Sequence, residues 1–96
     1  MAAPVLREHW IFSGLVQGVG FRWRARKAAE AAGVTGWVRN DLSGTVSLEL
    51  QGSREQIDRV LRDLERGRWI RIEERNVRSI PPDPEERSFR ALDDFW

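Results

Sequence analysis

This chain of 96 residues alternates between strand-like and helix-like stretches, and their order limits the folds that it can adopt. Residues 8–13 (EHWIFS) contain aromatic and β-branched side chains and precede Gly14, which predicts a strand. Residues 21–32 are rich in alanine, contain no β-branched residue and precede Gly33, which predicts a helix with a glycine C-cap. The chain therefore begins with a strand and a helix.

The next two stretches read as a β-hairpin. Residues 35–40 (TGWVRN) and 45–51 (TVSLELQ) both have strand composition, and apolar and polar side chains alternate along the second of them. The connection between them, residues 41–44, is too short for a crossover between parallel strands. We therefore expect the two strands to pair in antiparallel fashion.

A second helix is predicted after Ser53, from residues at its start, along its buried face and at its end. Ser53 and Gln56 have the spacing of a capping box, and Gly67 is expected to stop the helix. The apolar side chains at helical spacing, which predict its buried face, are Ile57, Val60, Leu61 and Leu64.

Two more strands complete the pattern. Residues 69–72 start a fourth strand that extends towards Val77, and residues 88–92 follow the proline-rich loop 81–84 as a short edge strand. The resulting β-α-β-β-α-β order predicts an α+β fold, the ferredoxin-like plait, with an antiparallel sheet and both helices on one face. A chain of this length has too little core to divide, so we expect residues 1–96 to form a single domain.

Composition excludes several kinds of site and partner. The chain has no cysteine and one histidine, which argues against thiolate chemistry, disulfides and a histidine-based metal cluster. Sixteen basic and fifteen acidic residues give a net charge of +1, so no overall field attracts nucleic acid or membranes. No apolar run approaches the roughly 18 residues of a membrane span, and residues 1–10 lack the apolar core of a signal peptide. We expect a cytoplasmic monomer that uses no metal or cofactor.

The segment between the first strand and the first helix, residues 13–22 (SGLVQGVGFR), carries the strongest chemical signal. Gly18 and Gly20 permit backbone angles that let consecutive N–H groups converge on an anion, next to the positive end of the helix. Arg22 in the first helical turn is unfavourable by about 0.3–1 kcal/mol unless an anion binds there. A second interpretation, that the glycines merely turn the chain and Arg22 is solvated, stays open. Nucleotide-binding fingerprints do not fit, because Trp23 stands where a third glycine belongs.

Two motifs resemble those of a known family. Residues 16–22 (VQGVGFR) and, after the first helix, residues 36–40 (GWVRN) closely resemble the acylphosphatase family in sequence, order and spacing. The resemblance extends over about residues 8–92. It implies the fold inferred above and the hydrolysis of acyl phosphates to a carboxylate and inorganic phosphate, without metal or cofactor.

The resemblance also implies the site residues. Arg22 would bind the phosphoryl oxygens through two hydrogen bonds, and Asn40 would hold and orient the attacking water. The phosphate-binding loop would add backbone N–H groups from Gln17, Gly18, Val19, Gly20 and Phe21. An acyl phosphate has a good leaving group, so positioning and charge stabilisation can replace a strong base. Without the resemblance, Asn40 would also fit an ordinary turn at a strand end.

Some features of the sequence depart from the pattern of the acylphosphatase family or fit another function. Ser43-Gly44 and Ser47 replace the Asp-Gly and glutamate that are common in the family, which bears on the rigidity of the hairpin rather than on the chemistry. Trp23 and Trp37 are expected to be packing residues rather than substrate platforms. The sequence is also compatible with two other functions: a non-catalytic anion-binding module of the same family, such as begins larger hydrogenase-maturation proteins, and an RNA-binding plait. The lack of aromatic residues in 45–51 argues against the last.

Overall fold

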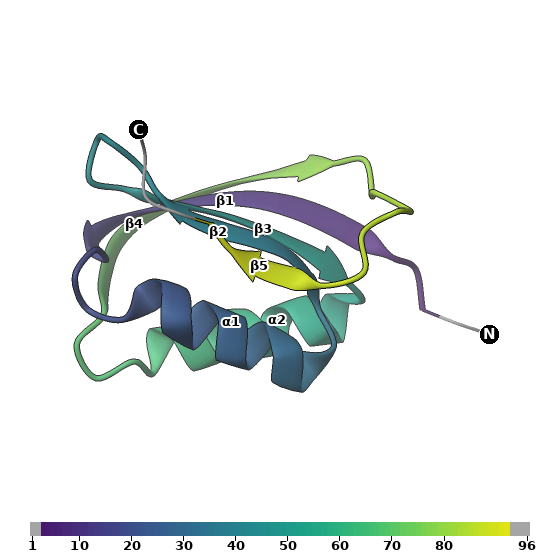
Figure 1. The fold of residues 1–96 in the computed structure, drawn as a ribbon, viewed down its shortest axis with the longest axis horizontal. Coiled ribbons are helices and arrows are strands. Elements are labelled where there is room, and N and C mark those ends of the chain that lie inside the picture. Colours follow the sequence, from purple (N-terminus) through teal and green to yellow (C-terminus); the bar gives the residue numbers. More distant parts are fainter. Residues whose placement is uncertain (1–2, 93–96) are drawn as a thin grey trace.

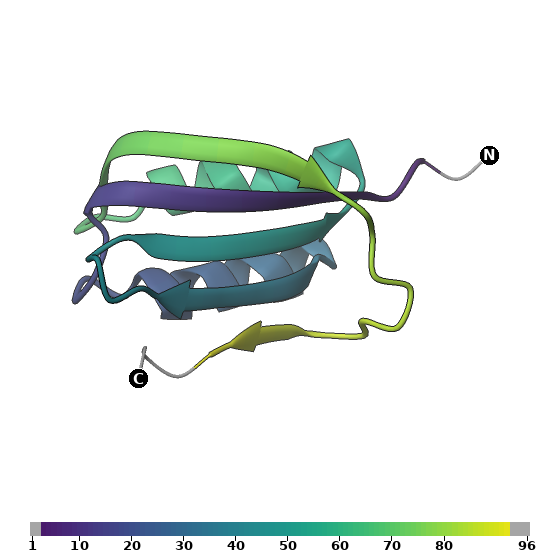
Figure 2. The same cartoon turned by 90° about the horizontal axis from the view of Figure 1, so that it is seen from above.

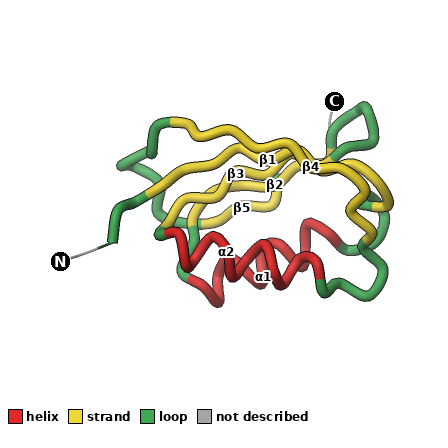
Figure 3. Tube along the Cα trace, turned by 180° about the vertical axis from the view of Figure 1, so that it is seen from behind, coloured by secondary structure: helices red, strands yellow, loops and turns green. Residues whose placement is uncertain are grey.

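The computed structural model describes residues 3–92 as one five-stranded sheet with two helices on the same face (Figures 1 and 3). In chain order the elements are β1 (Leu6–Leu15), α1 (Phe21–Ala32), β2 (Thr35–Asn40), β3 (Val46–Gly52), α2 (Arg54–Glu65), β4 (Arg71–Ile80) and β5 (Phe89–Ala91). This arrangement confirms the ferredoxin-like α+β plait. The last four residues, 93–96, for which the sequence predicts no element, lie outside the described residues.

The strands lie in the order β4-β1-β3-β2-β5 (Figure 2). Neighbouring strands pair in antiparallel fashion except at one edge, where β5 runs parallel to β2. The predicted edge strand is therefore present, but the sheet is mixed rather than antiparallel. The reason lies in the connection formed by residues 81–88. It leaves β4 and enters β5 at the same end of the sheet, so β5 runs opposite to β4. The chain then has to run in the direction of β2.

The sequence signals at the helix ends can be compared with the structure. Ser53 Oγ accepts a hydrogen bond from the Gln56 N–H (3.2 Å), and Gln56 Oε1 accepts one from the Ser53 N–H (2.8 Å), which completes the capping box. At the end of α1, Gly33 adopts the left-handed conformation with φ of 76°. α2 ends at Glu65 with Arg66 as its C-cap, so the helix stops directly before Gly67 as expected, although Gly67 does not adopt a positive φ. A Cβ at Gly67 would lie 2.6 Å from Ile70 Cδ1, so a larger residue there would force the Ile70 side chain to shift.

Strands β1 and β4 are longer than predicted, whereas β5 covers Phe89–Ala91 rather than 88–92. β1 covers Leu6–Leu15 rather than 8–13, and β4 starts after Trp69, at Arg71, and continues to Ile80. The two strands pair along their length, and this pairing extends each of them beyond the residues whose composition favours a strand.

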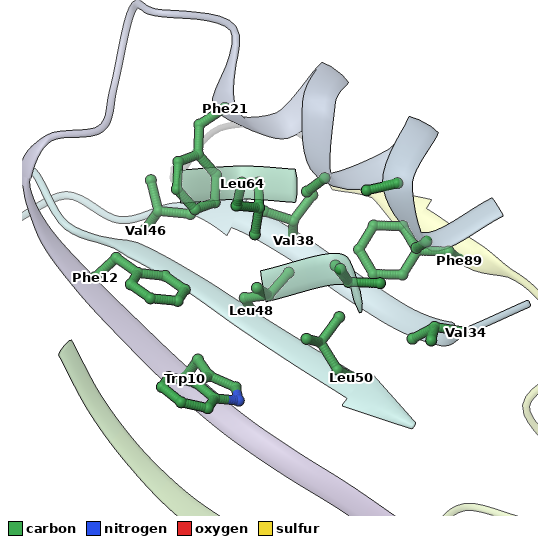
Figure 4. Close-up of a cluster of buried hydrophobic side chains, with 14 of the residues drawn as sticks. Trp10, Phe12, Phe21, Val34, Val38, Val46, Leu48, Leu50, Leu64 and Phe89 are labelled. Atoms are coloured by element: carbon green, nitrogen blue, oxygen red, sulfur yellow. The ribbon is translucent and has the colours of Figure 1, made fainter. Parts of the chain in front are cut away.

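The core lies between the helices and the sheet. Alternate residues of β3 point into it, and Phe12 and Phe21 meet there with ring centroids 5.5 Å apart (Figure 4). The alanines of α1 that are buried, and that allow this helix to lie close to the sheet, are Ala25, Ala28, Ala29 and Ala32. Leu61 was expected on the buried face of α2, but it is only partly buried at the margin of this core.

An ionic network centred on the buried Arg7 lies on the opposite face of the sheet. Arg7 of β1 is 6% exposed and contacts Glu49 of β3 (2.8 Å) and Glu86 of the connection to β5 (2.7 Å). His9 Nδ1 lies 2.7 Å from the second carboxylate oxygen of Glu49. Burial by itself raises the pKa of the Glu49 carboxyl, but the hydrogen bonds of His9 and Arg7 outweigh it and lower that pKa. The network fastens the long connection to the sheet.

We expect Glu49→Gln to lower the free energy of unfolding at pH 7 by about 1–3 kcal/mol, because it weakens charged hydrogen bonds in a buried site. The folded pKa of Glu49 is lower than its unfolded value of about 4.3, so its stabilisation is full above that value. The stabilisation is lost as the pH falls through the folded pKa. Urea unfolding from pH 7 to 3 should therefore show the two proteins converging in acid.

The control is Glu85→Gln, which removes the same charge from an exposed position next to this network. It should change stability by less than about 0.5 kcal/mol. A Glu49→Gln protein as stable as Glu85→Gln at pH 7 would show that the network contributes nothing.

Candidate functional site

The loop between β1 and α1 lies at the end of the sheet where β2 and β5 also end (Figure 1). Gly18 and Gly20 have φ of 73° and 80°, and a Cβ on either would contact nothing within 4 Å. The backbone conformation, rather than lack of space, therefore requires glycine at both positions. Gly20 is the N-cap of α1 and, as a glycine, has no side chain that could accept hydrogen bonds from the N–H groups at the positive end of this helix.

A glutamine side chain joins this loop to the β2–β3 hairpin. Gln17 Nε2 donates to the backbone carbonyls of Asp41 and Thr45, both at 2.8 Å. Within the hairpin, one oxygen of the Asp41 carboxylate accepts hydrogen bonds from the hydroxyls of Thr45 (2.9 Å) and Ser47 (2.7 Å). Ser47, which replaces the glutamate common in the family, is 4% exposed and serves to hold this turn. The hairpin is thus braced by its own side chains and by the glycine-rich loop.

A pocket of about 190 Å³ opens between the loop and the end of β2. Its lining residues are Val16, Gly18, Gly20, Phe21, Arg22, Trp23 and Asn40. Pockets for drug-sized ligands measure about 300–1,000 Å³, so this one suits a small ligand. It brings together five of the seven residues singled out from the sequence. Gln17 and Val19 are not among the lining residues.

Arg22 and Asn40 enter the pocket from different elements. Arg22 is half-buried in the first turn of α1, and its Nη1 donates to the carbonyl of Leu92 at 2.8 Å. Asn40 is the last residue of β2 and is held by its pairing with Val46 of β3. A guanidinium can donate two parallel hydrogen bonds to a phosphoryl group, and an amide can both donate to and accept from a water molecule. The two side chains therefore have complementary abilities within one small pocket.

The structure of residues 3–92 bears on two possibilities, a metal-ion site and a membrane-spanning helix. This part of the chain contains no group of three or more His, Cys, Asp or Glu residues that could hold a metal ion. Neither of its helices is long and apolar enough to cross a membrane.

Comparison with known proteins identifies the family. The family model for acylphosphatase matches residues 8–91. The chain belongs to the acylphosphatase family. It is 41% identical over 81 residues to the acylphosphatase of Bifidobacterium longum, an alignment that covers 83% of this chain and 84% of that protein.

Solved structures agree with the assignment to the acylphosphatase family. An acylphosphatase from Coxiella burnetii superimposes with a TM-score of 0.80 at 34% identity, covering 92% of this chain and 93% of that one. Full-length HypF, in a phosphate- and nucleotide-bound form, matches with a TM-score of 0.85 at 25% identity. That match covers 98% of this chain but 13% of HypF, so this fold also occurs as a small part of a larger protein.

Two features of this acylphosphatase-family pocket were not foreseen. Trp23 was expected to pack, but it is 65% exposed and lines the pocket. Helical periodicity contained the signal, because position 23 lies about 200° around the helix from the buried Phe21. The contact between Arg22 and Leu92 cannot be recognised in the sequence, because it joins residues 70 positions apart.

Proposed function

We propose that this chain hydrolyses acyl phosphates to a carboxylate and inorganic phosphate, with Arg22 binding the phosphoryl group and Asn40 orienting the attacking water. The observation that carries the proposal is the pocket that places both side chains beside the glycine-rich loop at the start of α1. Membership of the acylphosphatase family supports the same reaction.

In this mechanism the phosphoryl group lies in the loop formed by Gln17, Gly18, Val19, Gly20 and Phe21. The backbone N–H groups of the loop and the positive end of α1 stabilise its charge, and the guanidinium of Arg22 binds two of its oxygens. Charge on these oxygens shifts as the bond to the acyl oxygen breaks. Donors that are already in place stabilise that charge without reorganising during the reaction.

Asn40 completes the arrangement from the end of β2. Its amide holds a water molecule near the phosphorus, opposite the acyl oxygen, so that attack and departure lie in one line. The carboxylate leaves with the electron pair of the broken P–O bond. The oxygen of the water remains in the inorganic phosphate, and the protons of the water pass to the phosphate oxygens and to solvent. Because the carboxylate is a good leaving group, positioning contributes most of the catalysis.

The finer parts of the proposal concern the setting of the reaction. We infer that residues 1–96 act as one domain, as a cytoplasmic monomer on a small-molecule substrate, without nucleic acid or membrane. The near-neutral net charge of +1 supports the absence of nucleic-acid and membrane partners, because no overall field draws the protein to a polyanion.

The purified chain is expected to release phosphate from acetyl phosphate at an unchanged rate in excess EDTA, because no step of the mechanism uses a metal. Inorganic phosphate should inhibit competitively, since it occupies the loop that binds the phosphoryl group. The measurement is phosphate release under initial-rate conditions, with and without chelator. If chelation abolished the activity and a divalent cation restored it, the mechanism would be wrong.

The same preparation tests the alternative functions. A non-catalytic anion-binding module would gain thermal stability from phosphate but release none from acetyl phosphate. An RNA-binding plait would bind a short single-stranded RNA with a strong dependence on salt. Turnover together with competitive inhibition by phosphate would favour the hydrolase over both.

A further inference from the structure

One exposed residue of the pocket, Trp23, has no part in the mechanism above. Trp23 follows Arg22 in the first turn of α1, lines the same pocket and exposes 65% of its surface. The other large apolar residues of the lining, Val16 and Phe21, are 0% and 2% exposed because they belong to the core. Among the large apolar residues of the lining, Trp23 is therefore the one whose surface is accessible to a ligand.

The indole of Trp23 also contacts a side chain of its own helix. Lys27, four positions further along α1, has its Nζ 5.8 Å from the centroid of the indole ring, within the range of a cation–π contact. An aromatic ring whose position is already restricted loses little conformational freedom when a ligand contacts it. An exposed tryptophan beside a polar site is therefore suited to bind a flat apolar group.

The chemistry of the substrate places such a group nearby. An acyl phosphate has a phosphoryl end, which the loop and Arg22 bind, and an acyl end joined to it through one oxygen. The acyl group must leave the loop along the wall of the pocket, and Trp23, the neighbour of Arg22 in the chain, forms part of that wall.

Resting on the proposed function, we propose that Trp23 determines substrate specificity by stacking against the acyl group, so that the site favours acyl phosphates with aromatic acyl groups over small ones. The phosphoryl group is bound in the same way in either case. Trp23 thus changes which acyl phosphate is used and leaves the chemical step to Arg22 and Asn40.

The chain provides a matched control in Trp69. This tryptophan is 64% exposed, and Arg68 lies over its ring with the guanidinium carbon 4.9 Å from the centroid. Its exposure and its cationic neighbour resemble those of Trp23, but it lies in the connection between α2 and β4 and does not line the pocket. Truncating either side chain removes a similar exposed surface, so effects on the fold should be equal.

The experiment compares kcat/KM for benzoyl phosphate and acetyl phosphate in the wild-type chain and in Trp23→Ala, Trp23→Phe and Trp69→Ala. Trp23→Ala should lose about tenfold on benzoyl phosphate, equivalent to about 1.4 kcal/mol. On acetyl phosphate it should lose less than about twofold, because a methyl group covers little of the indole. Trp23→Phe should recover most of the loss, and Trp69→Ala should match the wild type on both substrates.

Binding of non-hydrolysable phosphonates gives a second readout that needs no turnover. Calorimetry should show that the wild type prefers benzylphosphonate to methylphosphonate and that Trp23→Ala loses this preference. Equal losses on both substrates, or no loss on either, would overturn the proposal. A wild-type chain that hydrolysed neither acyl phosphate but bound the phosphonates with this preference would contradict the proposed hydrolysis and still support the role of Trp23.

Discussion

Arg22→Gln is expected to lower kcat/KM for acetyl phosphate by at least about 10²–10³, the usual cost of removing one preorganised donor to a charged transition state. The reason is that glutamine keeps a hydrogen-bond donor but loses the charge and the paired N–H groups that match the phosphoryl oxygens. The variant should also lose most of the rise in melting temperature that phosphate gives the wild type. That rise reflects a stabilisation of about 2.7 kcal/mol at a ligand concentration of 100 Kd.

Arg26→Gln is the control, because it removes the same charge from the same helix one turn further on. Arg26 is exposed, pairs with Glu30 at 3.3 Å and does not line the pocket, so its loss should leave turnover within about twofold. Thermal unfolding measures the separate cost of the hydrogen bond from Arg22 to the Leu92 carbonyl, about 1 kcal/mol. Full stabilisation of Arg22→Gln by phosphate would show that the loop binds the anion without its arginine.

Asn40→Ala is expected to reduce turnover by a similar factor, about 10²–10³, while keeping most of the thermal shift with phosphate. The asymmetry follows from the proposed roles, because the water-orienting amide acts on the nucleophile and not on the bound phosphoryl group. Steady-state kinetics should accordingly show a large fall in kcat with a small change in KM. Thermal unfolding with phosphate supplies the binding half of the comparison.

Asn76→Ala serves as the matched control for Asn40→Ala. Asn76 lies on β4, where it is exposed and pairs with Ile11 of β1, away from the pocket. The same amide is lost at both positions, so only the change at Asn40 should reduce kcat. Near-normal turnover of Asn40→Ala would refute the role given to its amide, and loss of the phosphate shift would instead make Asn40 a phosphate ligand.

The elements that follow from local chemistry were predictable from the sequence. The capping box of Ser53 and Gln56 and the glycine after α1 have effects within a few residues of themselves, so they mark the helices. The alternation in β3 likewise shows which of its faces is buried. Gly67 directly follows the C-cap of α2, as expected, but its close packing against Ile70 is not evident from the sequence.

Features that depend on distant contacts were not predictable in this way. The parallel pairing of β5 depends on the path of residues 81–88 between the two edges of the sheet, and the ionic network of Arg7 depends on that path bringing Glu86 to Arg7. At the candidate site, the motifs predicted that Arg22 and Asn40 act together, and the structure places both in one pocket. The brace formed by Gln17 involves backbone carbonyls, which every residue possesses, so no side-chain pattern reveals it.

The hydrogen bond between Arg22 and the carbonyl of Leu92 has a consequence for how the protein is made. Its two partners are separated by 70 positions, and the carbonyl arrives only after β4 has formed and the chain has crossed to the far edge of the sheet. Contacts with so large a separation cost more loop-closure entropy than local ones. During synthesis the glycine-rich loop leaves the ribosome early, whereas the arginine beside it acquires this partner only when β5 docks. The nascent chain therefore contains both motifs long before it contains a finished anion site.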